Sequence, residues 1–166
     1  QLNAIKKFIE LNEIKKTIFL TPDVSFKNEI EKAISNSKIK ILENYVYNTD
    51  PTKLTKQIEK ITHYGVRKQN LEDEINRLEK SEQNNKERLI ERLKKRDTLG
   101  SVKFDSVVIS DFDESLKSVT TSLLYTDISP KDKYFITLNQ WFDESLLKEI
   151  SLQPLYFPSA NKSNYD

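Results

Sequence analysis

The chain has 166 residues, enough for one domain with a sizeable core. Its 27 Lys and Arg nearly balance its 26 Asp and Glu, which removes the overall electrostatic argument for a nucleic-acid or anionic-membrane protein. Cysteine is absent, which excludes disulfides and thiolate chemistry, and no apolar run reaches the roughly 20 residues that span a bilayer.

The sequence lacks the residues that common active sites require. Gly65 and Gly100 are the only glycines, whereas phosphate-binding loops need several, and His63 is the only histidine. We therefore predict no catalytic residue, no metal and no cofactor, and we expect His63 to lie inside a helix in a surface or packing role. The chain begins at Gln1 and contains no Met, so we expect a processed or excised piece of a longer protein.

The first third of the chain alternates helical and strand patterns. It predicts a helix over 1–11, a strand over 16–20, a helix that carries Phe26 and Ile30, and a strand over 39–47. We expect Asp23 or Ser25 to cap the second helix. In the second strand we expect four apolar side chains to share one side, namely Ile39, Ile41, Tyr45 and Tyr47.

The middle of the chain, from Thr52 to Thr98, has no strand pattern and is dense in charged and amide residues. Two helical stripes, Leu54 to Leu78 and Leu89 to Leu93, flank a polar turn at 81–85. They predict an antiparallel helical hairpin that projects from the globular body. A solvated spacer and a protein-docking arm both remain possible roles for it.

A β-α-β pattern follows. Strands are predicted at 107–109 and 134–138 with an amphipathic helix between them, then a short helix at 143–150 and a last strand at 155–157. Together these elements predict an α/β, three-layer fold with a mainly parallel sheet of about five strands in the order 2-1-3-4-5. The expected division is 1–52 and 99–166 for the two parts of the α/β body and 53–98 for the hairpin.

Three passages carry a resemblance to a known family, namely FDSVVISDFDESLKSVTTSLLYTDISPKD, YFITLNQWFDESLLKE and PLYFPSA. They resemble the penicillin-binding-protein activator lipoproteins, within the Leu/Ile/Val-binding-protein-like, type I periplasmic-binding superfamily. The helical insertion with its KKRDTLG exit is similar to that of bacterial activator homologues. The resemblance covers nearly the whole chain but only the second of the family's two lobes.

The resemblance implies a non-enzymatic periplasmic protein of a Gram-negative cell. In its full-length form it would be an outer-membrane lipoprotein whose lipid anchor lies outside this chain. Its role would be to regulate peptidoglycan synthesis through contact with a synthase, a penicillin-binding protein. The alternative is one lobe of a solute-binding receptor for an amino-acid-like ligand. A flavodoxin-like signalling domain ranks last, because Asp23 stands without a second acidic residue and no Lys closely follows PLYFP.

Ligand contacts in such sheets come from loops at the carboxyl ends of the strands. By loop position, the candidate ligand-binding residues are Thr21, Asp23, Ser25, Ser110, Asp111, Phe112, Asn139, Gln140 and Trp141. Each has a plainer alternative. Asp111 with Asp113 and Glu114 can bind a cation or start a helix, and Trp141 can stack on a ligand or pack in the core.

Overall fold

The computed structural model describes residues 1–111, 113–138 and 144–158 and contains a five-stranded sheet. Every neighbouring pair of strands is parallel, and the strand order is β2-β1-β3-β4-β5. The strands are β1 (Thr17–Pro22), β2 (Glu43–Tyr47), β3 (Ser106–Ile109), β4 (Tyr134–Thr137) and β5 (Leu155–Tyr156). This topology confirms the 2-1-3-4-5 order and the α/β fold class predicted from the sequence.

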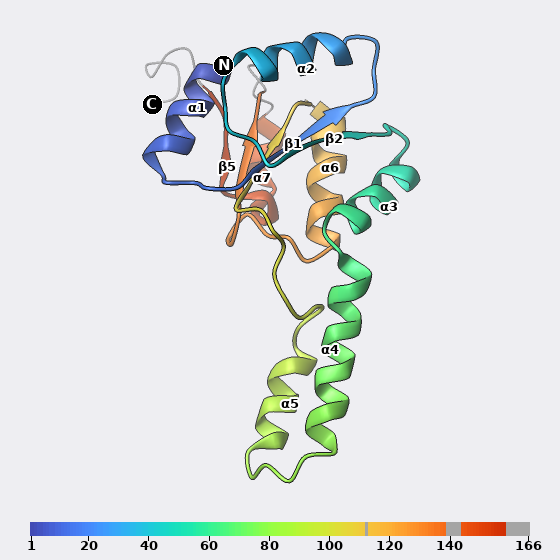
Figure 1. Cartoon of the computed structure of the whole chain (residues 1–166). Coiled ribbons are helices and arrows are strands. Elements are labelled where there is room, and N and C mark those ends of the chain that lie inside the picture. Colours follow the sequence, from blue (N-terminus) through green and yellow to red (C-terminus); the bar gives the residue numbers. More distant parts are fainter. Residues whose placement is uncertain (112, 139–143, 159–166) are drawn as a thin grey trace.

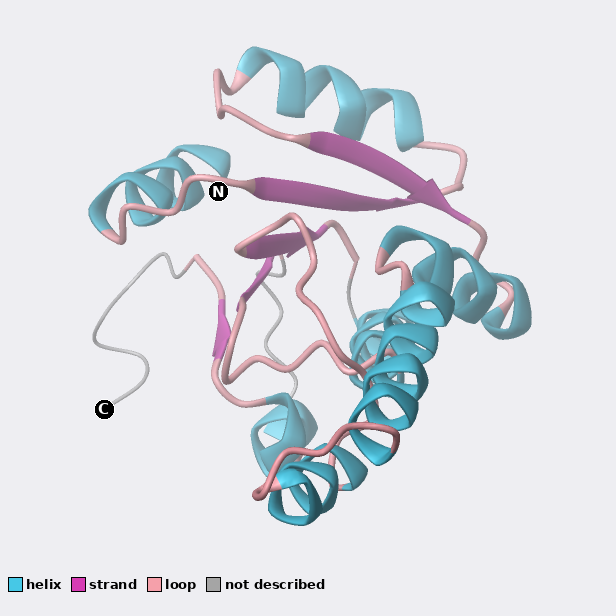
Figure 2. Ribbon diagram, turned by 60° about the horizontal axis from the view of Figure 1, so that its bottom comes forward, coloured by secondary structure: helices cyan, strands magenta, loops and turns pink. Residues whose placement is uncertain are grey.

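Helices cover both faces of the sheet, as Figure 2 shows, so the body has three layers. On one face α1 (Leu2–Leu11) and α2 (Lys27–Asn36) bury Ile5 and Ile34 against Phe19 and Val108. On the other face pack α3 (Pro51–Ile61), α6 (Asp113–Tyr125), α7 (Glu144–Lys148) and a 3-10 turn, η1 (Ile150–Leu152). The period-2 alternation of β1 and β3 divides their side chains between these two cores.

The projecting hairpin consists of α4 (Tyr64–Glu79) and α5 (Lys86–Lys94), which extend away from the body in Figure 1. Leu71 and Leu78 are buried along the seam between the two helices. The turn that joins them includes the predicted 81–85 segment. Helix α3 instead belongs to the body, because its Leu54 and Ile58 are fully buried in the core with α6.

The prediction that His63 lies inside a helix is wrong. His63 has a left-handed backbone (φ 51°) at the residue that separates α3 from α4. The helical stripe from Leu54 to Leu78 is therefore interrupted, and the interruption lets α3 pack on the body while α4 leaves it. Thr62, just before the break, is buried and donates its hydroxyl to the Ile58 carbonyl oxygen at 2.8 Å.

Two further local predictions are wrong. Strand β2 begins at Glu43, and the irregular segment before it places Ile39 and Ile41 in the α1–α2 core, opposite Tyr45 and Tyr47. Neither Asp23 nor Ser25 caps α2, because Phe26 occupies the N-cap position and no side chain bonds there. The Asp23 carboxylate pairs with Lys27 at 2.9 Å. In both cases the sequence indicated correctly which residues are apolar and buried or polar and exposed, but it gave the wrong local backbone conformation.

Candidate functional site

The carboxyl edge of the sheet gathers the described members of the candidate set. In the strand register Pro22 lies opposite Tyr47, and Ile109 lies opposite both Leu20 and Thr137. Ser110 and Asp111 therefore emerge beside the end of β1, where Thr21 is buried. Phe112, Asn139, Gln140 and Trp141 lie outside the described residues, so their placement as candidate ligand contacts stays a prediction.

Asp111 is held on the face of the sheet that packs against α3 and α6. The Tyr47 hydroxyl donates a short hydrogen bond to Asp111 Oδ2, and Thr137 Oγ1 donates to the Asp111 carbonyl oxygen at 3.3 Å. Burial, reinforced by the bond to Asp111, raises the pKa of Tyr47 well above its ordinary value. Tyr47 is therefore a protonated donor that ties the end of β2 to the residue after β3.

Ser110 and Thr21 lie on the opposite face. Thr21 Oγ1 donates to Asn44 Oδ1 at 2.8 Å, which satisfies it within the fold. Ser110 Oγ differs, because the residue is only 6% exposed and its hydroxyl has no hydrogen-bond partner among the described residues. Its backbone N–H is satisfied by the Leu20 carbonyl oxygen at 2.9 Å, so the unmet group is the side chain alone.

Asp23 and Ser25 are the exposed members of the candidate set. The Asp23 backbone N–H donates to the Tyr47 carbonyl oxygen at 2.9 Å, which fixes this loop against the end of β2. Its carboxylate and Lys27 form an exposed i,i+4 ion pair, and that hydrogen bond raises the pKa of Lys27. An exposed pair of this kind contributes little to stability, so Asp23 can exchange Lys27 for another cation at small cost.

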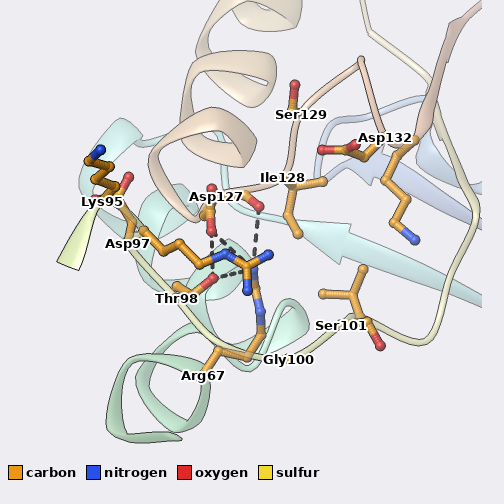
Figure 3. A pocket seen from close by; sticks show the side chains of 13 residues that line it. Arg67, Lys95, Asp97, Thr98, Gly100, Ser101, Asp127, Ile128, Ser129 and Asp132 are labelled. Carbon is orange, nitrogen blue, oxygen red and sulfur yellow. Dashed lines mark hydrogen bonds and ion pairs between the residues drawn. The ribbon is translucent and has the colours of Figure 1, made fainter. Parts of the chain in front are cut away.

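A second polar cluster, which the sequence did not reveal, joins the hairpin to the body (Figure 3). Arg67 of α4 is 5% exposed, and its guanidinium donates to the Thr126 carbonyl oxygen at 2.9 Å and to Thr98 Oγ1 at 2.8 Å. Thr98 in turn donates to Asp127 Oδ2 at 2.5 Å, and Arg67 lies 3.7 Å from the same carboxylate oxygen. Burial lowers the pKa of Arg67, and the Asp127 charge opposes that shift.

This joint borders a polar cavity of about 420 Å³ at the amino edge of the sheet, opposite the ends that carry Ser110 and Asp111. Its lining comes from α4, from the segment after α5 and from the loop between α6 and β4. The two Nη atoms of Arg67 donate to carbonyl and hydroxyl oxygens of the fold, so the cluster anchors α4. Arg67 Nε, which is also buried, has no hydrogen-bond partner among the described residues. Helix α6 lies between the two clusters: the anchor is at the carboxyl end of α6, and Asp111 comes just before its first turn.

Among the side chains that the structure describes, no three of Asp, Glu or His lie close enough together to hold a metal ion. The Asp113 side chain lies outside that set, so the alternative of a cation bound by Asp111, Asp113 and Glu114 stays a prediction. Across the described residues, no helix is both long and apolar enough to cross a membrane. At the carboxyl edge, the Ser110 hydroxyl is a buried polar group without a hydrogen-bond partner among the described residues.

Comparison with known proteins supports the fold. The chain is similar to an extracellular ligand-binding receptor from Verminephrobacter eiseniae, with a TM-score of 0.50 and 10% sequence identity over 82% of this chain. The match spans 29% of the receptor's length. No protein-family model and no curated protein matches the sequence. The topology and this likeness together show a parallel α/β fold that is similar to part of that receptor.

Proposed function

We propose that the chain is one lobe of a periplasmic solute-binding receptor and that its carboxyl sheet edge contacts the ligand. The observation that carries the proposal is the buried Ser110 hydroxyl without a partner, at the edge where parallel sheets of this kind bind ligands. Leaving a buried hydroxyl unpaired costs about 1–3 kcal/mol, which a hydrogen bond from a ligand removes. The structural likeness to a ligand-binding receptor supports the same reading.

An amino-acid-like ligand fits the chemistry of this edge. The Ser110 hydroxyl can donate to a carboxylate or accept from an ammonium group. The same edge carries the Asp111 carboxylate and the exposed Asp23, whose ion pair with Lys27 a ligand ammonium group can replace. A small zwitterion offers groups complementary to both features.

The hypothesis of a peptidoglycan-synthesis regulator receives less support. A protein-docking hairpin would be expected to show an exposed apolar patch. Among the described residues of α4 and α5, however, Val66 is the only large apolar residue that is highly exposed. The likeness to a receptor also favours the solute-binding alternative. A synthase partner therefore stays a prediction from the resemblance.

The proposal is tested by thermal unfolding of the protein with each common amino acid in turn. A ligand present at about 100 times its dissociation constant stabilises by about 2.7 kcal/mol, which is a shift of several degrees in Tm. We expect at least one amino acid to raise Tm in the wild type and to do so much less in Ser110→Ala. If no amino acid shifts Tm, the proposal of an amino-acid-like ligand is wrong.

A pull-down from envelope extract addresses the regulator hypothesis separately. The pull-down compares the whole chain with a variant that lacks the outer part of the hairpin. This deletion must spare α3 and Arg67, because both hold the body together. Replacing Leu71–Lys94 by a short linker removes the distal hairpin only. Recovery of a peptidoglycan synthase that depends on those residues would favour the regulator over the receptor.

A further inference from the structure

A groove at the amino edge of the sheet combines an apolar floor with a basic rim. It lies between the end of α1 and the segment after α2, and its volume is about 640 Å³. The floor consists of Ile9, Ile14 and Ile39, two of which are buried. The rim carries four lysines and two carboxylates, namely Lys6, Lys15, Lys38, Lys40, Glu10 and Glu13. We call these nine residues the lysine groove.

The charges of the lysine groove are not neutralised within the fold. None of its four lysines forms an ion pair with a carboxylate of the described residues. The rim therefore has a local excess of positive charge, although the whole chain is nearly neutral. Because salt screens charges over about 8–10 Å, a docking partner responds to this local excess and not to the net charge. The overall charge balance is thus a poor guide to this surface.

Two rim residues occupy backbone conformations that glycine normally fills. Glu13 (φ 53°) and Lys38 (φ 57°) each follow the C-cap of a helix, α1 and α2 respectively. This left-handed position is usually taken by Gly or Asn, because other side chains are strained there. Both ends of the groove therefore keep a charged side chain at the expense of backbone strain.

An exposed leucine accompanies the groove. Leu11, the last residue of α1, is 83% exposed and follows Glu10 of the rim directly. A bare apolar side chain beside a cluster of lysines is the pattern of a peripheral membrane contact. The leucine enters the interface, while the lysines keep their ammonium groups at the anionic headgroups.

We propose that the lysine groove and Leu11 dock on an anionic phospholipid surface. Charge complementarity favours anionic lipid, because the lysines exceed the carboxylates on the rim. The contact lies at the amino edge of the sheet, so it leaves the carboxyl edge with Ser110 facing away from the membrane. This contact is independent of the ligand proposed above.

Vesicle sedimentation tests the proposal with the whole chain. The protein should sediment with vesicles that contain phosphatidylglycerol and stay in solution with phosphatidylcholine alone. Each lysine near an anionic surface contributes about five-fold in partition, so Lys40→Ala should lower binding by about that factor and Glu13→Gln should raise it. Lys80→Ala, at the exposed far end of α4, removes the same charge elsewhere and should change binding little.

Lys38→Gly separates a membrane role from a purely structural one. Glycine relieves the left-handed strain, so the variant should raise Tm by about 3 °C while lowering vesicle binding about five-fold. Leu11→Ser should also weaken binding without lowering Tm. The proposal is overturned if wild type ignores phosphatidylglycerol vesicles, if Lys80→Ala weakens binding as much as Lys40→Ala, or if Lys38→Gly binds like wild type.

Discussion

Ser106 and Ser110 lie on the same face of one strand and its extension but have opposite hydrogen-bonding states, which gives a matched pair of variants. Ser106 Oγ, fully buried in β3, donates to Thr17 Oγ1 at 2.8 Å, whereas Ser110 Oγ has no partner among the described residues. Ser106→Ala loses that bond and strands the Thr17 hydroxyl, so it should destabilise the fold by about 1 kcal/mol or more.

Ser110→Ala should have the opposite effect. It deletes a buried hydroxyl whose unmet hydrogen bond costs about 1–3 kcal/mol, and it creates only a small void. We expect a net stabilisation of about 1 kcal/mol, which is a rise of about 2–4 °C in Tm for a chain of this size. Ser106→Ala should shift Tm downward by a similar amount.

The assay is urea unfolding followed by circular dichroism, with the slope m required to stay constant across the three proteins. If Ser110→Ala destabilises the protein as much as Ser106→Ala does, the Ser110 hydroxyl is satisfied inside the fold. The Ser110 hydroxyl would then not be available to bond a ligand, and the proposed function would lose the observation that supports it.

Variants at three further residues test the Tyr47–Asp111 contact, the Arg67 cluster and the left-handed residue between α3 and α4. Burial raises the pKa of Tyr47 above that of an unfolded tyrosine, so protonated Tyr47 contributes its full share of the free energy of unfolding below about pH 10. That share is lost as pH rises further, and Tyr47→Phe should remove this part of the loss of stability at alkaline pH in urea unfolding. Arg67→Met leaves the Thr126 carbonyl oxygen and the Asp127 carboxylate without their partner, so it should lower the free energy of unfolding by about 3 kcal/mol. It should also speed limited proteolysis of the hairpin, and Arg67→Lys should have an intermediate effect on both. His63→Gly relieves a left-handed residue and should stabilise by about 1 kcal/mol in the same assay; a loss of stability would refute the strain argument.

The architecture was predictable because its strongest signals are local. The β-branched run at Val107 and Val108 and the apolar run after Tyr134 each read as a buried strand, and the helical spacing of Leu116 and Leu123 supplied the crossover. Parallel pairing and the strand order then followed from general rules of connection. The structure confirms this part of the prediction.

The errors arose where tertiary contacts override a local pattern. The stripe from Leu54 to Leu78 reads as one helix, yet the packing of α3 on α6 requires a break that His63 supplies from a left-handed conformation. Asp23 is a different case, because its partner Lys27 is only four residues away and the i,i+4 spacing of opposite charges was visible in the sequence. The break at His63, in contrast, is not encoded in residue spacing alone.

The polar clusters were missed for a related reason. Arg67 precedes Leu71 by four residues and so falls on the apolar stripe of α4, and a charge on such a stripe is a signal of a buried, bonded group that could have been noticed. Tyr47 gave no comparable signal, because its partner Asp111 lies 64 residues away in sequence. The unmet Ser110 hydroxyl could be recognised only from the positions of the described residues around it.

The most direct test of the central claim is an NMR titration of the chain with amino acids, since it detects weak binding to a single lobe. The account predicts that the backbone amide signals of Thr21, Ser110 and Asp111 shift with a common saturation curve. It also predicts that Lys38 and Lys40, at the opposite edge, stay unchanged. Shifts confined to the hairpin or the lysine groove, or no shifts with any amino acid, would contradict the claim that the carboxyl edge of this lobe binds an amino-acid-like solute.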